Sequence, residues 1–330
     1  LKAEVAAERL REMNPNCRVS WMRGDIIYDL GLGFLETMDV FIGCLDNRVA
    51  RLYLNRYAYR LGKTWINGGL LNLSGSLDVF RPGISCYECG LRPAEWRIIR
   101  YRLGCNDIAK RNANQGRIPT TPISASIIGA MQAQEAFKVI NGDDDSLLAD
   151  RQFRYDGTCN EANFLPAKSL KKDCLSHVRW DSIIQGEELT ATMTVGKLLI
   201  GLERLLGVSN PKVHLEYDII LELYSEESHR ATPVLLPRFR IDEATYRKYQ
   251  FIAGESVRIP PEMTVSELDS SFPQQEATLM EVGIPPWQIL QVEAGDAFHF
   301  ISLAGDRGHY FGSGTKKVAQ SATANHQNTT

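Results

Sequence analysis

A nearly continuous apolar run that ends in a polar turn and leads into a helix is the feature that most restricts the fold. Residues 38–43 are typical of a strand buried on both faces. Helix-forming residues with apolar spacing then fill 46–61, Gly62 marks a helix end, and residues 64–67 predict the next strand. This strand, helix, strand alternation predicts parallel units in a doubly wound α/β sheet, where ligands bind at the carboxyl ends of strands.

The pattern of predicted helices and strands changes near residue 182. Before residue 182, periodicity predicts an opening helix that stops at Asn14-Pro15, a helix over 124–141, and strands at 17–21, 76–81 and 152–156. After it, the pattern predicts a smaller α+β domain over 182–312, with a helix at 194–206 and strands at 212–215 and 219–224. The segments 264–268, 278–282, 288–293 and 297–303 suggest a small mixed α/β module within it. Residues 313–330 are polar without periodicity, which favours disorder.

Composition excludes several classes of function. The chain has 330 residues, 44% apolar side chains and a net charge of -3, enough for two cores. No block of Lys and Arg offers nucleic acid a concentrated positive field. Neither an apolar run of 18 residues nor a secretory signal is present, so we expect no membrane role and a cytoplasmic location.

Seven cysteines form an odd, uneven set, which favours reduced thiols over a disulfide framework. Cys17 and Cys44 lie on predicted strands, and we expect both in the core. Cys86 and Cys89 form a C-x-x-C pair, a spacing that lets two thiolates share one tetrahedral metal ion but supplies only half a site. A redox dithiol is the competing interpretation, although the thioredoxin-like context is absent.

A polar turn follows the predicted strand 38–43. Asp46 and Asn47 lie where this strand meets a helix N-terminus, a place that suits phosphates and Mg²⁺. Asp46 is placed to hold the metal ion, and Asn47 and Arg51 are placed to contact nucleotide or neighbouring backbone. The alternative is a plain helix cap, which Asp and Asn form frequently.

These residues carry a family resemblance. Cys44-Leu-Asp-Asn47, followed by Arg51, Asn55 and the run Gly-Lys-Thr-Trp-Ile-Asn-Gly-Gly69, resembles the ThiF/MoeB and ubiquitin-activating family of adenylating enzymes over most of residues 1–180. The resemblance implies a Rossmann-like adenylation domain over 1–181 whose first strand and glycine-rich loop would precede Leu1. It implies nucleotide contacts from Lys2, Asp46, Asn47, Arg51 and Asn55, although Lys2 also fits a solvated terminal charge.

The resemblance also implies a second pair of metal ligands and a thioester residue. Cys174 and His177, spaced C-x-x-H, resemble the pair that completes a structural zinc site with Cys86 and Cys89, and Cys159 is the reserve ligand. Cys105 lies where ubiquitin-type members carry their thioester cysteine, with Arg100, Arg102 and Lys110 close in sequence. An isolated cysteine is as often a small buried apolar residue.

The implied activity is ATP- and Mg²⁺-dependent adenylation of the C-terminal glycine of a ubiquitin-like protein, with Cys105 and Asp46 as catalytic residues. A sulfur-carrier adenylyltransferase of the thiamin, molybdopterin or tRNA-thiolation type is the first alternative, and a non-catalytic scaffold subunit is the second. The resemblance further suggests a homodimer and a conjugating-enzyme-like partner.

Overall fold

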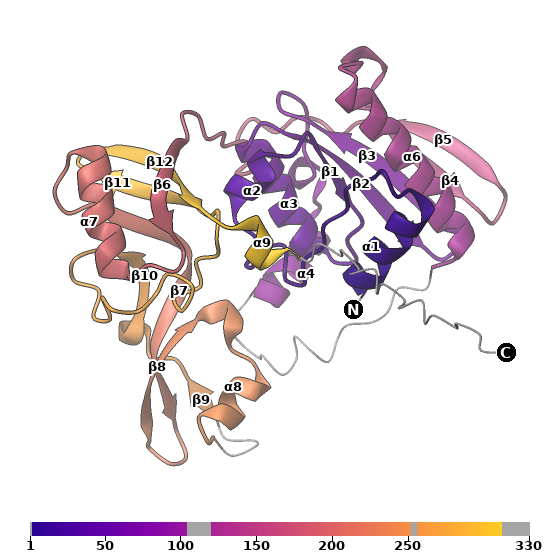
Figure 1. The fold of residues 1–330 in the computed structure, drawn as a ribbon. Helices are drawn as coiled ribbons and strands as arrows, with labels where there is room; N and C mark the ends of the chain where they lie inside the picture. Colours follow the sequence, from indigo (N-terminus) through magenta and orange to yellow (C-terminus); the bar gives the residue numbers. More distant parts are fainter. Residues whose placement is uncertain (1, 104–119, 252–255, 312–330) are drawn as a thin grey trace, which may run out of the picture. The chain divides into compact units, whose positions relative to one another are not determined.

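The computed structural model describes residues 2–103, 120–251 and 256–311 (Figure 1). The chain divides into two compact units, residues 1–24 with 306–330 and residues 25–305. The described part of the first unit contains helices α1 (Lys2–Met13) and α9 (Arg307–Tyr310). The strand predicted at residues 17–21 is wrong, because only Trp21 forms a bridge there, and Cys17 is exposed rather than buried.

The second unit begins with a five-stranded sheet of order β1-β2-β3-β4-β5. Its strands are β1 (Val40–Gly43), β2 (Thr64–Leu71), β3 (Ser74–Phe80), β4 (Arg151–Asp156) and β5 (Glu161–Pro166). Strands β1 and β2 are parallel, as the strand, helix, strand pattern predicts, and the other neighbours are antiparallel. The α/β class is confirmed, with a mixed sheet.

Helices cover both faces of this sheet. They are α2 (Leu32–Glu36), α3 (Arg48–Arg60), α4 (Pro93–Leu103) and α6 (Pro122–Ile140), with short 3-10 turns η1 (Glu88–Gly90) and η2 (Asp144–Ser146). Adjacent residues of a strand point to opposite faces. Trp65 of β2 accordingly packs with Leu54 of α3, and its neighbour Ile66 packs with Ile128 of α6. The sheet therefore lies between α3 and α6.

A second sheet has the order β10-β7-β11-β12-β6, and β8 and β9 also pair with β7. Its strands are β6 (Ile184–Thr190), β7 (Lys212–Ser225), β8 (Ala231–Pro237), β9 (Val257–Arg258), β10 (Thr264–Leu268), β11 (Ile289–Ala294) and β12 (Ala297–Ala304). The strands of this sheet that come first and last in the sequence, β6 and β12, are neighbours and run parallel. The short elements are η3 (Arg238–Arg240), α8 (Glu243–Lys248) and η4 (Pro261–Met263).

One prediction in this region differs from the structure. The strands predicted at 212–215 and 219–224 are one continuous strand, β7. Segment 278–282, for which the sequence suggests no particular element, forms a turn, because Glu281 Oε2 accepts hydrogen bonds from the backbone N–H and hydroxyl of Thr278. Leu279 and Val282 in that turn are nevertheless fully buried, which accounts for the apolar signal.

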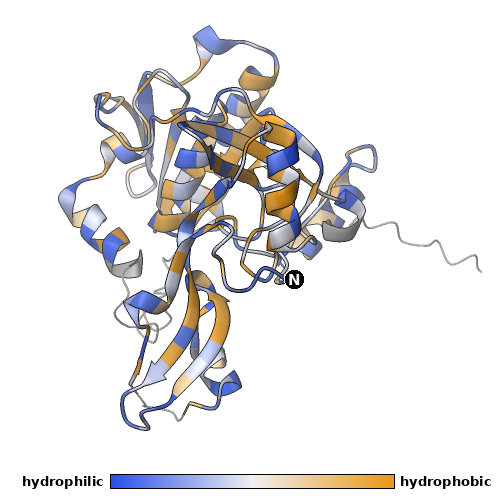
Figure 2. Cartoon of the chain, turned by 90° about the vertical axis from the view of Figure 1, so that its left-hand side faces the viewer, coloured by the Kyte–Doolittle hydropathy of each residue, from blue (hydrophilic) through white to orange (hydrophobic). Residues whose placement is uncertain are grey.

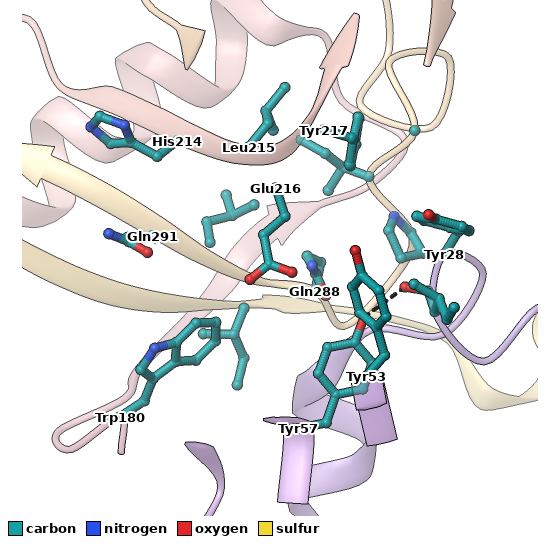
Figure 3. Close-up of a pocket in the computed structure, with 16 residues that line it drawn as sticks. Tyr28, Tyr53, Tyr57, Trp180, His214, Leu215, Glu216, Tyr217, Gln288 and Gln291 are labelled. Atoms are coloured by element: carbon teal, nitrogen blue, oxygen red, sulfur yellow. Dashed lines mark hydrogen bonds between the residues drawn. The ribbon is translucent and has the colours of Figure 1, made fainter. Parts of the chain in front are cut away.

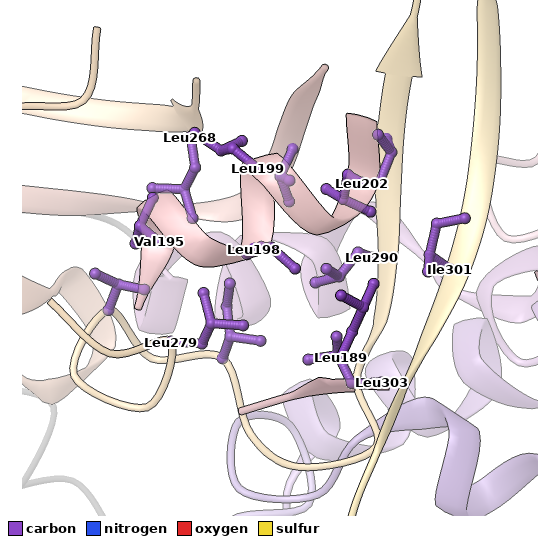
Figure 4. Close-up of a cluster of buried hydrophobic side chains, with 14 of the residues drawn as sticks. Leu189, Val195, Leu198, Leu199, Leu202, Leu268, Leu279, Leu290, Ile301 and Leu303 are labelled. Atoms are coloured by element: carbon purple, nitrogen blue, oxygen red, sulfur yellow. The ribbon is translucent and has the colours of Figure 1, made fainter. Parts of the chain in front are cut away.

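Helix α7 (Val195–Leu206) organises the core of the second sheet (Figure 4). Its buried residues Val195, Leu198, Leu199 and Leu202 follow helical spacing and face the apolar side chains of β11 and β12. The Thr194 hydroxyl accepts from the N–H of Lys197 at its start, and Gly207, with φ of 67°, ends it. Figure 2, coloured by hydropathy, shows that apolar residues are also concentrated along the strands.

The two sheets lie on either side of residue 182 in sequence, but residues 25–305 form one compact unit. The Trp180 ring stacks on Phe300 of β12 at 4.6 Å, and Ile289 of β11 packs in the same cluster as Leu32 of α2. The boundary near 182 therefore stays a prediction. The predicted disordered tail, 313–330, lies outside the described residues. Among the described helices, none combines the length and apolarity that crossing a membrane requires.

Two leucines of α7 test the core. Leu202 is fully buried and Leu205 is 42% exposed on the same helix. We expect Leu202→Ala to lower the free energy of unfolding by about 2–5 kcal/mol, because it leaves a cavity, and Leu205→Ala to change it by less than about 1 kcal/mol. Urea denaturation followed by circular dichroism measures both. Equal effects would show that α7 does not pack as described.

Candidate nucleotide site and metal centre

The polar turn after β1 leads directly into α3. Asn47 caps this helix, its Oδ1 accepting from the N–H of Ala50 at 2.8 Å, and its Nδ2 donates to Asp46 Oδ1 at 3.3 Å. Asp46 is exposed at the carboxyl end of the strand. The cap predicted as the alternative is therefore present, and it orients the neighbouring carboxylate, which keeps oxygen lone pairs available for a cation.

Arg51 binds the backbone at this end of the sheet. Its Nη2 donates to the carbonyl of Leu45 at 2.6 Å and to that of Gly68 at 3.1 Å, and its Nε donates to Leu45 at 3.2 Å. These bonds tie the turn after β1 to strand β2. Burial lowers the pKa of Arg51, but a guanidinium remains charged. Within the described part of the chain its guanidinium donates to backbone carbonyls rather than to a carboxylate, so its positive charge lies at the strand ends.

Gln132 of α6 supports the same strand ends from the opposite face. Its Nε2 donates to the carbonyls of Gly43 and Ile66, each at 3.1 Å, and its Oε1 accepts from the Cys44 thiol at 3.7 Å. The expectation that Cys44 lies in the core is wrong, because β1 ends at Gly43 and Cys44 is exposed on the turn. Although the residue as a whole is exposed, partial desolvation of its sulfur raises the pKa of the Cys44 thiol, which disfavours the thiolate form.

Four side chains predicted as metal ligands come together in the structure. The ligand atoms of Cys86, Cys89, Cys174 and His177 all lie within 4.8 Å of one another. The Sγ atoms of Cys86 and Cys89 are 3.7 Å apart, those of Cys86 and Cys174 are 3.6 Å apart, and Cys89 Sγ lies 3.4 Å from His177 Nε2. Two sulfurs at about 2.3 Å from one tetrahedral zinc ion lie about 3.8 Å apart, so the donor set fits zinc.

The pKa directions of this cluster describe its protonation when no cation is bound. Burial raises the pKa of the thiols of Cys86 and Cys174, and burial lowers the pKa of His177. Without a cation, the buried thiols therefore stay protonated and the imidazole stays neutral. A divalent metal reverses this balance for thiols because it stabilises the thiolates directly.

The side chain of Asn55 makes no hydrogen bond to the other residues predicted to contact nucleotide, among those that the structure describes. It is 1% exposed, and its amide is occupied by Tyr87 N, Trp65 Nε1 and Ser176 Oγ at 2.9, 3.3 and 2.9 Å. Those partners belong to β2 and to the two turns that carry the metal ligands. The family resemblance implied a nucleotide contact for Asn55, but its side chain binds the turns that carry the candidate metal ligands, and we assign it no nucleotide contact.

Other predicted site residues lie elsewhere. Lys2 is exposed on α1 in the first unit. Cys105 lies outside the described residues. The reserve ligand Cys159 is exposed near the turn between β4 and β5, where its thiol contacts the carbonyl of Asp156, and it does not join the metal cluster.

A pocket lies between α3 and the second sheet (Figure 3). Its volume is about 50 Å³, room for a few water molecules and too little for a nucleotide. Glu216 points its carboxylate into this space near Tyr53, and it pairs with Arg60 of α3. Tyr57 donates to the carbonyl of Ile27 at 2.9 Å. None of the predicted site residues lines this pocket, so we treat it as packing between two layers.

A family model described as "ThiF family" matches residues 1–176, which is more than half of the chain. The chain therefore belongs to the ThiF family. This match covers β1, α3, β2 and the three cysteines of the candidate metal cluster, Cys86, Cys89 and Cys174, and it stops at residue 176, one position before His177. The polar turn after β1 and three of the four candidate metal ligands thus lie within the family domain.

Curated relatives and solved structures resemble the chain over part of their length. "Adenylyltransferase and sulfurtransferase MOCS3" of Drosophila virilis is 25% identical over 276 residues, covering 82% of this chain and 52% of that protein. The same protein of Drosophila grimshawi is 30% identical over 177 residues, covering 52% of this chain and 36% of the relative. The chain thus spans about half of the first relative and about a third of the second. The crystal structure of E. coli MccB with ATP is 18% identical with a TM-score of 0.41, covering 54% of this chain and 50% of that one.

Metal analysis tests the cluster. We expect the protein, purified under reducing conditions, to carry about one zinc ion per chain, because four converging ligands satisfy tetrahedral coordination. Cys174→Ser should lower the zinc affinity by at least tenfold, and Cys159→Ser should leave it unchanged, because Cys159 is outside the cluster. Zinc is measured by mass spectrometry of the metal and by competition with a chromophoric chelator. Equal zinc binding by Cys174→Ser would contradict the ligand assignment.

Proposed function

We propose that the protein is an ATP-dependent adenylyltransferase that activates the C-terminal carboxylate of a small protein of the sulfur-carrier or ubiquitin-like class. The observation that carries this proposal is the arrangement after β1 in a ThiF-family chain. There, an exposed carboxylate, Asp46, sits beside a capped helix N-terminus, and the positive charge of Arg51 is held against the strand ends.

The reaction follows from the chemistry of carboxylates. A carboxylate resists nucleophiles because of its negative charge. Its oxygen attacks the α-phosphorus of ATP, the bond from that phosphorus to the bridging oxygen breaks, and pyrophosphate leaves with the electron pair. The product is an acyl-adenylate, whose AMP is a good leaving group for the next nucleophile. Magnesium, when bound, offsets the charge that develops on the phosphates.

Each candidate nucleotide-binding residue has a distinct task in this proposal. Asp46 supplies the exposed carboxylate oxygens that hold Mg²⁺, oriented by the hydrogen bond from Asn47 Nδ2. Arg51 places its charge at the turn without moving, because three hydrogen bonds to backbone carbonyls anchor its guanidinium. Lys2 contacts the phosphates in this proposal, as the family resemblance implies.

The sulfur-carrier form of the activity is the better supported one. The curated relatives are named adenylyltransferases and sulfurtransferases, which favours sulfur transfer to the activated carboxylate over a thioester with a conjugating enzyme. Cys105, the proposed thioester residue, lies outside the described residues. Sulfur transfer requires no thioester on Cys105. Cys105 is essential only in the second candidate, a ubiquitin-like activating enzyme that passes its substrate to a conjugating-enzyme-like partner.

The remaining parts of the proposal concern the setting of the enzyme. Zinc in the Cys86, Cys89, Cys174 and His177 centre is structural, because four protein ligands leave no open position. We place the protein in the cytoplasm, where thiols of this kind stay reduced, and we propose a homodimer.

ATP–pyrophosphate exchange tests the role of Asp46. Asp39 and Asp46 are both exposed and lie just before and just after strand β1, so they make a matched pair. With the full-length gene product and a candidate carrier protein, we expect Asp46→Asn to lower exchange by about 100-fold or more, because it removes the metal-binding charge, and Asp39→Asn to keep it. Normal exchange by Asp46→Asn would remove this residue from the mechanism.

A covalent assay separates the two forms of the activity. Incubation with ATP and a carrier or ubiquitin-like protein, followed by gel analysis with and without reductant, reports a thioester. Sulfur-carrier activation predicts exchange without a reductant-sensitive band in wild type and in Cys105→Ala. A band that only Cys105→Ala loses would support the ubiquitin-like form, and absence of exchange with every candidate protein would support a non-catalytic scaffold.

A further inference from the structure

Two turns carry the metal ligands, and each places a buried polar residue between its pair. Glu88 lies between Cys86 and Cys89 and is 6% exposed. Ser176 lies between Cys174 and His177 and is 2% exposed. The Ser176 hydroxyl donates to Glu88 Oε2 at 2.5 Å. A short hydrogen bond between the intervening residues therefore joins turns that are 88 residues apart in sequence.

Helix α3 contributes a side chain, Asn55, that binds both turns. Asn55 Nδ2 donates to Ser176 Oγ at 2.9 Å, and Asn55 Oδ1 accepts from the backbone N–H of Tyr87 at 2.9 Å. One side chain thus binds the C-x-x-C turn through its backbone and the C-x-x-H turn through Ser176. The hydroxyl of Ser176 uses its single proton toward Glu88 and a lone pair toward Asn55, so donors and acceptors match throughout.

Glu88 also has its charge compensated from the same helix. Arg56 Nε lies 3.3 Å from Glu88 Oε2, and their side chains are 25% and 6% exposed. A carboxylate buried beside three thiols is costly unless it is paired and hydrogen-bonded. Arg56 and Ser176 satisfy both conditions. Consecutive residues of α3, Asn55 and Arg56, are therefore committed to the metal centre, while the start of the same helix carries the cap beside Asp46.

We propose that Asn55, Ser176 and Glu88 are positioning residues that bring the two ligand turns to coordination distance before a metal ion binds. This inference rests on the proposed zinc centre. In this proposal, the hydrogen bonds among Asn55, Ser176 and Glu88 lower the conformational entropy that is lost when the four ligands are ordered around the metal ion. It also makes α3 the common support of the metal centre and of the polar turn after β1.

Removal of one member should therefore weaken metal binding without removing a ligand. Ser176→Ala deprives Asn55 and Glu88 of their shared partner and leaves all four ligands in the chain. Loss of such an outer hydrogen bond typically lowers metal affinity 10- to 100-fold. Ser176→Thr keeps the hydroxyl and should restore most of the affinity. Glu88→Gln, which keeps the shape and loses the charge, is the second variant if Ser176→Ala does not fold.

Ser124→Ala is the matched control. Ser124 is fully buried and hydrogen-bonded, its hydroxyl lying 3.2 Å from the Thr121 carbonyl, but it lies at the start of α6 and touches none of the four ligands. If the network acts only through general stability, Ser124→Ala and Ser176→Ala should change metal binding alike. If it positions the ligands, only Ser176→Ala and Glu88→Gln should weaken it.

The experiment measures zinc affinity of the full chain by competition with a chromophoric chelator, and records the absorption of the Co²⁺-loaded protein as a report on tetrahedral geometry. We expect a 10- to 100-fold loss of affinity and a weaker Co²⁺ ligand-field spectrum for Ser176→Ala, rescued in Ser176→Thr. Tight zinc binding by wild type with equal affinity in Ser176→Ala and Glu88→Gln would overturn the positioning role alone. Failure of wild type to bind zinc or Co²⁺ would overturn the zinc centre as well, while adenylation would still be decided by pyrophosphate exchange.

Discussion

A single buried amide, that of Asn55, connects the parts on which the family domain depends. Its oxygen accepts from the indole of Trp65 on β2 and from the backbone of Tyr87, and its nitrogen donates to Ser176. A buried amide left without these partners would be strongly destabilising, so the sheet, the first ligand turn and the second ligand turn must all be in place together. Helix α3, which carries Asn55, is fixed by these hydrogen bonds near its centre and by the Asn47 cap at its start.

Helices α3 and α6 together hold the polar turn after β1. Arg51 of α3 and Gln132 of α6 bind backbone carbonyls of β1, β2 and the turn from opposite faces of the sheet. The charges at the strand ends are thereby placed by hydrogen bonds to backbone rather than by flexible ion pairs. A preorganised site of this kind suits phosphate chemistry, because little reorganisation is needed when charge develops.

Sequence reasoning predicted the features that depend on local pattern. The β1, α3, β2 unit, helices α6 and α7, and the convergence of Cys86 and Cys89 with Cys174 and His177 follow from periodicity, from spacing and from the family resemblance. It missed features that depend on partners distant in sequence. Strand β5 is exposed along its length and lacks apolar alternation, and the hydrogen bonds of Asn55, Ser176 and Glu88 join segments that no local pattern relates. Cys44 was expected in the core with the apolar strand before it, but β1 ends at Gly43 and Cys44 is exposed.

The most direct test of the central claim is the mass of the carrier protein after reaction. A sulfur-carrier protein ending in glycine is incubated with the full-length gene product, ATP and Mg²⁺, quenched, and analysed by intact mass spectrometry with fragmentation. Adenylation predicts a mass increase of one AMP located on the terminal glycine, absent when ATP is replaced by an analogue that cannot be cleaved between the α- and β-phosphates. An unmodified terminal glycine with every carrier tested, despite hydrolysis of ATP, would contradict the account.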